Sequence, residues 1–163
     1  MRTTDKHIFF WNGIYSQWYK SPIIIDGKKF NCLEQWMMYN KASLFNDNYH
    51  KDLIMQTNDP RKQKEYGRKV NGFDKEKWDS VAFDIVKKGN YEKFTQISEF
   101  KDEILNTGDL IFVEASPYDK IWGIGMRENA PGVDDEKNWN GKNLLGKAII
   151  EVRNIIKSEN GKI

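Results

Sequence analysis

The segment NCLEQWMMYNKASLF, residues 31–45, determines how the rest of the chain is interpreted, because its apolar residues recur at helical spacing. Positions three, four and seven apart share one face of a helix. One such face holds Glu34, Met38, Lys41 and Phe45, and the neighbouring face holds Leu33, Trp36, Met37, Asn40 and Leu44. This pattern predicts a largely buried helix that carries two opposite charges on an apolar stripe.

The spacing of these two charges does not match an ordinary surface ion pair. Glu34 and Lys41 are seven residues apart, a rise of roughly 10 Å along a helix, whereas surface pairs form at a spacing of three or four. Lysine side chains on a helix lean toward its N-terminus, so Lys41 reaches back toward Glu34. The two charges therefore suggest two walls of one pocket.

Each charge also has a structural explanation, and at this point both explanations remain open. Asn31 and Glu34 have the spacing of a capping box, and the helix macrodipole favours a carboxylate in the first turn. Lys41 can lay its methylene stem on apolar surface while its ammonium stays in water. Either explanation alone would remove the need for a pocket.

The composition is that of one globular domain. The chain has 163 residues, of which 39% are hydrophobic and 31% charged, and its aromatic share of 13% is high. This length is enough to bury a core without disulfides, so we expect a single domain over residues 1–163. The net charge of +2 neither requires nor excludes a nucleic-acid partner.

Several classes of site are not expected. Cys32 is the only cysteine and there are two histidines, so the sequence offers neither an internal disulfide nor a metal-ligand cluster. The N-terminal residues lack the apolar core of a signal peptide, and no apolar run approaches the roughly 20 residues of a membrane span. We therefore expect a cytoplasmic protein with no membrane partner and no metal.

The secondary structure predicted from local patterns is mixed. Residues 7–11 and 21–31 are rich in β-branched and aromatic residues, and Asp26-Gly27 is typical of a two-residue hairpin turn. A short helix is predicted within residues 46–59, and further helices are predicted after Asp59-Pro60, Asp74, Ser98 and Asn143, which are residues typical of helix N-caps. The helix after Asp74 is expected to end at Gly89. This order predicts a mainly helical α+β fold with small antiparallel hairpin or sheet elements.

A second group of candidate residues follows a predicted buried strand at residues 109–115. Glu114 interrupts the end of this apolar run, and a glycine-rich loop over residues 116–142 comes next. Trp122 and Trp139 in this loop are candidates for stacking on a ligand, whereas Trp11, Trp36 and Trp78 are expected in the core. Glu114 either faces solvent or is buried with a partner beside a pocket mouth.

The chain lacks the motifs of the large nucleotide-binding and hydrolase families. It has no Gly-x-Gly-x-x-Gly after a strand, no phosphate-loop Gly-Lys-Ser/Thr, no Gly-x-Ser-x-Gly and no His-Glu-x-x-His. The remaining chemistry is that of carboxylates, lysines and tryptophans.

The ordered set of short motifs resembles the NADAR, or YbiA-like, N-glycosidase family. The matching elements are Ser16–Trp18, the Asp-Gly turn, Glu34 and Lys41 with six residues between them, Trp78-Asp79, Lys93-Phe94, TGDLIFVEAS at residues 107–116, YDKIWGIG at residues 118–125, and GKNLLGKAIIEVR at residues 141–153. Gln17 stands where the family usually has asparagine, and Met38 where a glutamine is common. No single element is specific, but their order and spacing together are.

This resemblance implies an enzyme that hydrolyses the N-glycosidic bond of a phosphoribosyl- or ADP-ribose-linked base. Family members are associated with intermediates of riboflavin synthesis or with removal of ADP-ribose from guanine. The implied catalytic residues are Glu34 and Lys41. The implied substrate-binding residues are Ser16, Trp78, Glu114, Asp119, Trp122, Gly123 and Asn143. No cofactor or metal is implied, and the partner is a small nucleotide-sugar or an ADP-ribosylated nucleic acid.

Two mechanisms and one non-catalytic alternative remain open. A carboxylate can stabilise the positive charge that develops on the ribose, or activate a water molecule. In the second mechanism, known for the family, a neutral lysine forms a Schiff base with the opened sugar, which requires burial to lower its pKa. The alternative is a sensor that binds NAD or ADP-ribose without turnover, and retention of both Glu34 and Lys41 favours the enzyme.

Overall fold

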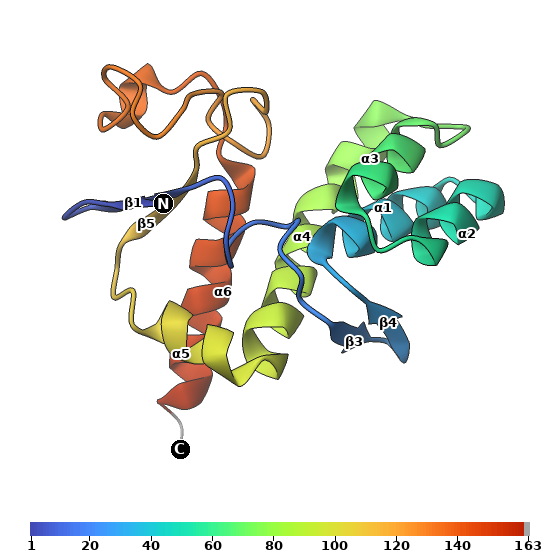
Figure 1. Cartoon of the computed structure of the whole chain (residues 1–163), viewed down its shortest axis with the longest axis horizontal. Coiled ribbons are helices and arrows are strands. Elements are labelled where there is room, and N and C mark those ends of the chain that lie inside the picture. The colour runs from blue at the N-terminus through green and yellow to red at the C-terminus, as the bar shows by residue number, and fades with distance from the viewer. Residues whose placement is uncertain (162–163) are drawn as a thin grey trace. The chain divides into compact units, whose positions relative to one another are not determined.

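The computed structural model describes residues 1–161 and confirms the α+β class, with helices dominating over two small sheets (Figure 1). The chain divides into two compact units. Unit one consists of Met1–Ser16 and the chain from Ser98 onward, and unit two is Gln17–Ile97. Each unit is described by itself below.

Unit two begins with the predicted hairpin and continues with four helices. Its elements are β3 (Ile23–Ile25), β4 (Lys28–Phe30), α1 (Leu33–Leu44), α2 (Asn48–Gln56), α3 (Pro60–Arg68) and α4 (Lys75–Gln96). Asp26 and Gly27 have φ angles of 52° and 80°, as a tight hairpin turn requires, and Ile23 pairs with Phe30. The hairpin prediction is confirmed.

Helix α1 is the centre of unit two, where it packs against α2, α3 and α4 (Figure 1). Its residues Leu33 and Trp36 form a buried cluster with Ile23, Ile25 and Phe30 of the hairpin. The indole Nε1 of Trp36 donates a hydrogen bond to the carbonyl of Ile85 on α4, at 2.8 Å. The prediction of a largely buried helix is therefore confirmed.

The expected end of helix α4 at Gly89 is wrong, because α4 continues to Gln96. A Cβ atom at position 89 would lie 2.5 Å from Cδ1 of Trp36. The glycine therefore allows α4 to approach the indole ring closely and does not end the helix.

The expected capping box between Asn31 and Glu34 is also wrong. Helix α1 begins one residue later than that motif requires, with Cys32 as its N-cap. The third helical residue is consequently Gln35, and its Oε1 accepts the backbone N–H of Asn31 at 2.8 Å. Gln35 therefore has the capping role that the sequence pattern had assigned to Glu34.

Two predicted helix caps, Asp59 and Asp74, are confirmed by side-chain hydrogen bonds, and in α2, which was predicted without a named cap, Asp47 has the same role. Asp47 accepts the backbone N–H of His50, Asp59 accepts that of Arg61, and Asp74 accepts that of Lys77. Each carboxylate satisfies a backbone donor that has no partner within its helix.

Unit one contains a three-stranded sheet and two α-helices. Its elements are β1 (Arg2–Thr3), β2 (His7–Phe10), α5 (Ser98–Leu105), β5 (Ile111–Glu114), the short 3₁₀ helix η1 (Glu136–Asn138) and α6 (Leu144–Asn160). The strand order is β1-β2-β5. Strands β2 and β5 are parallel, with Phe9 opposite Val113, a pairing that the expectation of antiparallel elements did not include.

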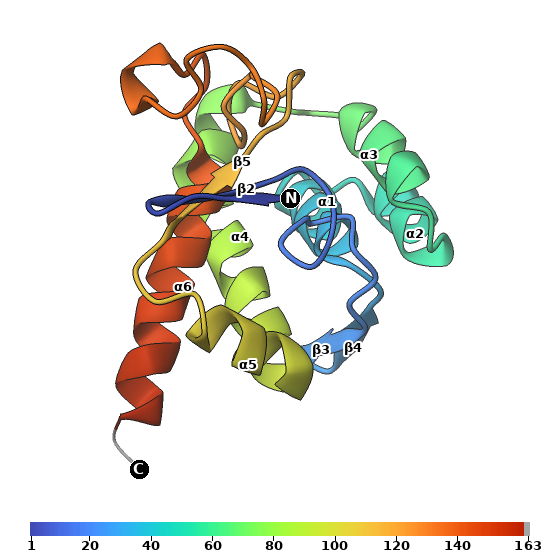
Figure 2. The same ribbon diagram turned by 60° about the vertical axis from the view of Figure 1, so that its left-hand side comes forward.

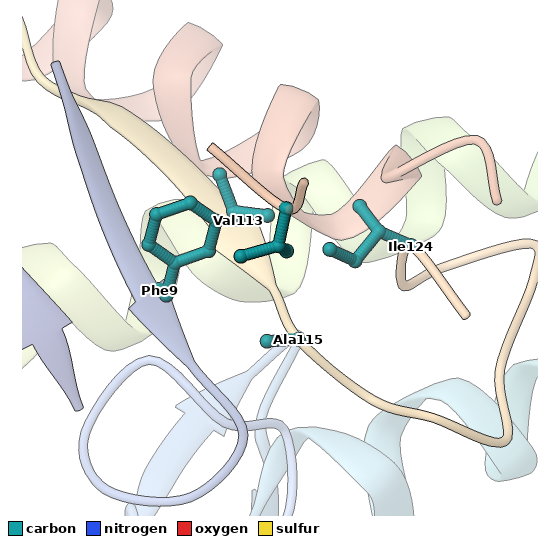
Figure 3. Close-up of a cluster of buried hydrophobic side chains, with 5 residues drawn as sticks. Phe9, Val113, Ala115 and Ile124 are labelled. Carbon is teal, nitrogen blue, oxygen red and sulfur yellow. The ribbon is translucent and has the colours of Figure 1, made fainter. Parts of the chain in front are cut away.

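The core of unit one surrounds these paired strands. Phe9, Val113, Ala115, Ile124 and Val133 form a buried cluster (Figure 3). Helix α6 packs against β5 (Figure 2). The long loop after β5 is therefore anchored to the sheet through Ile124 and Val133.

Two tryptophans of unit one differ from their predicted surroundings. Trp139, expected to stack on a ligand, is half-buried against the core cluster and donates its Nε1 hydrogen to the carbonyl of Val133 at 2.7 Å. Trp11, expected in the core, is 44% exposed and contacts the ring of Tyr118. Both belong to irregular segments, where no periodic pattern indicates which way a side chain points.

Within residues 1–161, every helix is too short or too polar to span a lipid bilayer. In the same residues, no group of three or more histidine, cysteine, aspartate or glutamate side chains is placed to hold a metal ion.

Replacing Gly89 with alanine should destabilise the protein, although alanine favours helices more than glycine does. The added methyl group would overlap Trp36 and disturb its hydrogen bond to Ile85. We expect the free energy of unfolding to fall by about 2 kcal/mol in chemical denaturation. Asp84→Ala, at an exposed position of the same helix, should change it by less than about 0.5 kcal/mol. A stabilised Gly89→Ala variant would contradict the packing role of this glycine.

Candidate functional site

Glu34 and Lys41 lie on one helix of unit two, as predicted. Glu34 is 7% exposed, and its backbone N–H donates to the carbonyl of Gln17 at 3.0 Å. Lys41, two turns later, is partly exposed. Burial lowers the pKa of the Lys41 amine, the negative charge of Glu34 raises it, and the positive charge of Arg68 lowers it. The two predicted residues therefore interact electrostatically, and the net effect holds the pKa of the Lys41 amine below its ordinary 10.5.

An aromatic residue that the sequence did not single out lies beside Lys41. The Lys41 Nζ atom is 4.5 Å from the centre of the Phe73 ring. Phe73 is 45% exposed and makes an edge contact with Phe45, the C-cap residue of α1, at a centroid distance of 5.5 Å. Phe73 belongs to a short loop between two helices, where its sequence neighbours give no sign of this contact.

Helix α3 follows α1 closely along this part of unit two. The Cys32 thiol donates to Oε1 of Gln63 at 3.2 Å. Four residues later on α3, a Cβ atom at Gly67 would overlap the sulfur of Met38. Met38, which departs from the family pattern, therefore has a structural role here, because its sulfur packs directly on the glycine backbone of α3.

Unit two also contains a second amine with an unusual environment. Lys93 on α4 is fully buried, and burial lowers the pKa of its amine to about 7. The sequence indicated this lysine only as part of a family motif. Lys93 is buried whereas Lys41 is partly exposed, so Lys41 is the more accessible of the two amines.

In unit one, the structure brings five predicted residues together at the end of β5. Asn143 links this region to α6: its Nδ2 donates to the carbonyl of Phe112 at 2.9 Å, and its Oδ1 accepts the backbone N–H of Glu114 at 3.0 Å. Asn143 is the N-cap residue of α6 but makes no capping hydrogen bond with its side chain. The predicted side-chain cap is therefore wrong, because β5 uses the same amide.

Asp119, Trp122 and Gly123 complete this cluster. Asp119 accepts the backbone N–H of Trp122 at 2.8 Å, which folds the start of the loop into a turn. A Cβ atom at Gly123 would lie 2.9 Å from the carbonyl oxygen of Glu114, so glycine permits the close approach of loop and strand. Trp122 is half-buried. These contacts show how Asp119 and Gly123 shape the loop.

The remaining two predicted residues lie elsewhere. Ser16 is buried at the end of the first segment of unit one, and its backbone N–H donates to the carbonyl of Gly13 at 3.0 Å. Trp78 lies on α4 of unit two and is 7% exposed, as a core residue would be. A surface hollow of about 600 Å³ in unit one, lined by Arg2 and residues of the 129–135 loop, includes none of the predicted residues.

The comparisons with known proteins place the chain in a family. The NADAR domain model matches residues 9–157. N-glycosidase R617 of Acanthamoeba polyphaga mimivirus is 40% identical over 163 residues, covering 92% of this chain and 96% of its own length. N-glycosidase YbiA of Escherichia coli is 28% identical over 141 residues, covering 86% and 79%.

The fold agrees with this relationship. The solution NMR structure of E. coli YbiA superposes with a TM-score of 0.81 at 26% identity and covers 99% of this chain and 91% of YbiA. The matched family model extends over residues of both units. The chain belongs to the NADAR-domain family.

Proposed function

We propose that this protein hydrolyses the C–N bond between a base and the ribose of a phosphoribosyl or ADP-ribosyl group, with Glu34 and Lys41 as the reacting side chains. The general class, a hydrolase acting on N-glycosyl bonds, follows from membership of the NADAR family and from relatives named N-glycosidases. One observation carries the residue assignment: a buried carboxylate and an accessible amine of lowered pKa interact on one stripe of α1.

The proposed role of Glu34 follows from the charge that develops when the bond breaks. As the base leaves, positive charge accumulates on the anomeric carbon and ring oxygen of the ribose. A carboxylate that is 7% exposed interacts with this charge more strongly than a solvated carboxylate would, because little water screens it. Glu34 can also accept a proton from an attacking water molecule.

The proposed role of Lys41 is to attack the anomeric carbon. The neutral amine forms a bond to the anomeric carbon while the bond from that carbon to the base breaks, and the base leaves with the proton that the amine loses. The bond between the anomeric carbon and the ring oxygen then breaks, the ring oxygen takes the remaining proton from the nitrogen, and the opened sugar is held as an imine. Water then hydrolyses the imine and regenerates the amine. Burial, which lowers the pKa of Lys41, increases the fraction of neutral amine at neutral pH.

The other predicted residues stay a proposal for substrate binding. In unit one, the cluster of Glu114, Asp119, Trp122, Gly123 and Asn143 supports it, since these residues converge at the end of β5. Of these, Trp122 has the side chain suited to stack on a base or sugar. Asp119 and Asn143 use their side chains to position backbone, so we propose that they act by holding Trp122 and Glu114 in place. Ser16 and Trp78 remain candidates from the family pattern alone.

Replacing Glu34 with glutamine should lower turnover at least about a hundredfold while leaving the fold and substrate binding intact. Glutamine has nearly the same shape but carries no charge and cannot accept a proton in this role. Release of free base from a confirmed substrate measures the effect. Glu65→Gln, at an exposed position of α3, should retain normal turnover. Near-normal turnover of Glu34→Gln would remove Glu34 from the chemistry.

Treating the enzyme and its substrate with borohydride should trap a covalent adduct on Lys41, because reduction converts the imine into a stable secondary amine. Mass spectrometry of the peptides should find the adduct on Lys41 and not on the buried Lys93. Lys41→Arg should be inactive and give no adduct, since arginine stays protonated and forms no imine. An active Lys41→Arg variant, with no adduct in the wild type, would leave water activated by Glu34 as the mechanism.

The pH dependence of turnover should agree with the covalent route. Only the neutral amine attacks, so turnover should be low below the pKa of Lys41 and rise as the pH increases through it. Burial places this pKa below the ordinary 10.5, so the rise should be complete at a lower pH than an exposed lysine would allow. A rate independent of Lys41 ionisation would contradict a nucleophilic role.

A further inference from the structure

Charged side chains line one edge of the contact between α1 and α3, and only two of them, Glu34 and Lys41, have a role in the proposed reaction. We call this edge the α1–α3 seam and define it by Glu34 and Lys41 of α1 and Lys64 and Arg68 of α3. Beside the proposed reacting pair, the seam carries two cations, Lys64 and Arg68, and Arg68 acts electrostatically on Lys41. Among residues 1–161, neither Lys64 nor Arg68 has a carboxylate within salt-bridge distance. Lys64 and Arg68 therefore take part in none of these ion pairs, and both are available to bind an anion.

The contacts between the helices fix the direction of the seam. Gln63 of α3 meets Cys32, the N-cap residue of α1, and Gly67, one turn further along α3, meets Met38, six residues further along the chain from Cys32. Lys64 and Arg68 directly follow these two contact residues and, at a spacing of four, lie on the same side of α3. They therefore border the contact one turn apart.

Each end of the seam carries an exposed aromatic ring beside a lysine. Trp18 follows Gln17, whose carbonyl binds the N–H of Glu34, and its ring is 41% exposed and 6.0 Å from Nζ of Lys64. Phe73 lies at the other end, against Phe45 and beside Lys41. Glu34 and Phe45 are eleven residues apart, a rise of roughly 16 Å along a helix. The two rings thus mark opposite ends of α1.

Hydrogen bonds and a glycine fix the conformation of the loop at residues 69–74, which holds Phe73 in its exposed position. The backbone N–H of Asn71 donates to the buried carboxylate of Asp47 at 2.8 Å, and Asp47 also binds the backbone and Nδ1 of His50, at 3.0 and 2.7 Å. Gly72, next to Phe73, has a φ angle of 76°, a conformation that glycine adopts without strain. The loop therefore presents an apolar ring to solvent where burial would be expected.

Exposed rings bind flat bases by stacking, and cations between them bind phosphate. We propose that Trp18 and Phe73 are the stacking residues at the two ends of the α1–α3 seam, and that Lys64 and Arg68 bind phosphate between them. The seam then takes a ligand with a ring at each end and a diphosphate in the middle. This rests on the proposed function, because the base stacked on Phe73 is the one released beside Lys41, and it favours an ADP-ribosyl over a phosphoribosyl substrate.

Binding of three probes by isothermal titration calorimetry tests this assignment without requiring turnover. The probes are diadenosine diphosphate, AMP and ribose 5-phosphate, which carry two bases, one base and none. Wild-type protein should bind them in that order, with at least about a tenfold loss at each step, because each stacked base contributes separately. Mass spectrometry of the recovered ligand checks that it is unchanged.

Single substitutions test which residues stack on the bases and which bind the phosphate groups. Trp18→Leu and Phe73→Leu should each weaken diadenosine diphosphate binding about tenfold, and only one of them should weaken AMP binding. Arg68→Gln and Lys64→Gln should weaken all three probes. Tyr49→Leu, at a 71% exposed ring on α2, and Lys62→Gln, at an exposed position of α3, are the matched controls and should bind as wild type does. Phe73→Tyr keeps an aromatic ring and should restore affinity.

Three results would overturn the inference: no binding of any probe to the wild type, equal affinities for the three probes, or unchanged affinity in both leucine variants with normal melting temperatures. If Phe73→Leu fails to fold, Phe73→Tyr, Trp18→Leu and Arg68→Gln still decide it. Failure here with retained turnover by Glu34 and Lys41 would leave the proposed function standing. Binding as predicted without base release would instead refute the proposed hydrolysis.

Discussion

The close packing of helix α1 is the constraint on which unit two depends. Three helices cover α1, and two of them can approach only because glycine stands at the contact, Gly67 against Met38 and Gly89 against Trp36. The covered faces are filled by apolar side chains and by the hydrogen-bonded amide of Gln35, and a charged group there would lose its hydration. The charges of α1 are therefore confined to the edge that borders α3, where Glu34 and Lys41 occur together.

The position of Glu34 and Lys41 at this edge also favours the reaction proposed for them. A carboxylate at the edge of a packed helix is screened less by water than one on an open surface, and an amine in the same place is more easily neutral. Both conditions arise from the packing of α1 against its neighbouring helices. The loop that carries Phe73 adds an apolar ring to the same edge, and it is fixed to the start of α2 through Asp47.

Features set by neighbouring residues could be predicted from the sequence, and features set by distant ones could not. The Asp26-Gly27 hairpin, the caps at Asp59 and Asp74, and the position of Glu34 and Lys41 on one helix follow from local spacing. The parallel pairing of β2 with β5 joins segments about a hundred residues apart, and Phe73 reaches Lys41 only through tertiary packing. The contact of Gly89 with Trp36 is tertiary as well, so the local pattern predicts a helix end where α4 continues.

The most direct test of the central claim is release of free base, measured by chromatography and mass spectrometry, from a panel of riboflavin-pathway phosphoribosyl intermediates, NAD and guanine-linked ADP-ribose, with free ADP-ribose as the reference for binding. The wild type should release base and the corresponding sugar in equal amounts from at least one of these compounds, and Glu34→Gln and Lys41→Arg should not. Tight binding of ADP-ribose with no base released from any compound would contradict the central claim and identify the protein as a nucleotide sensor.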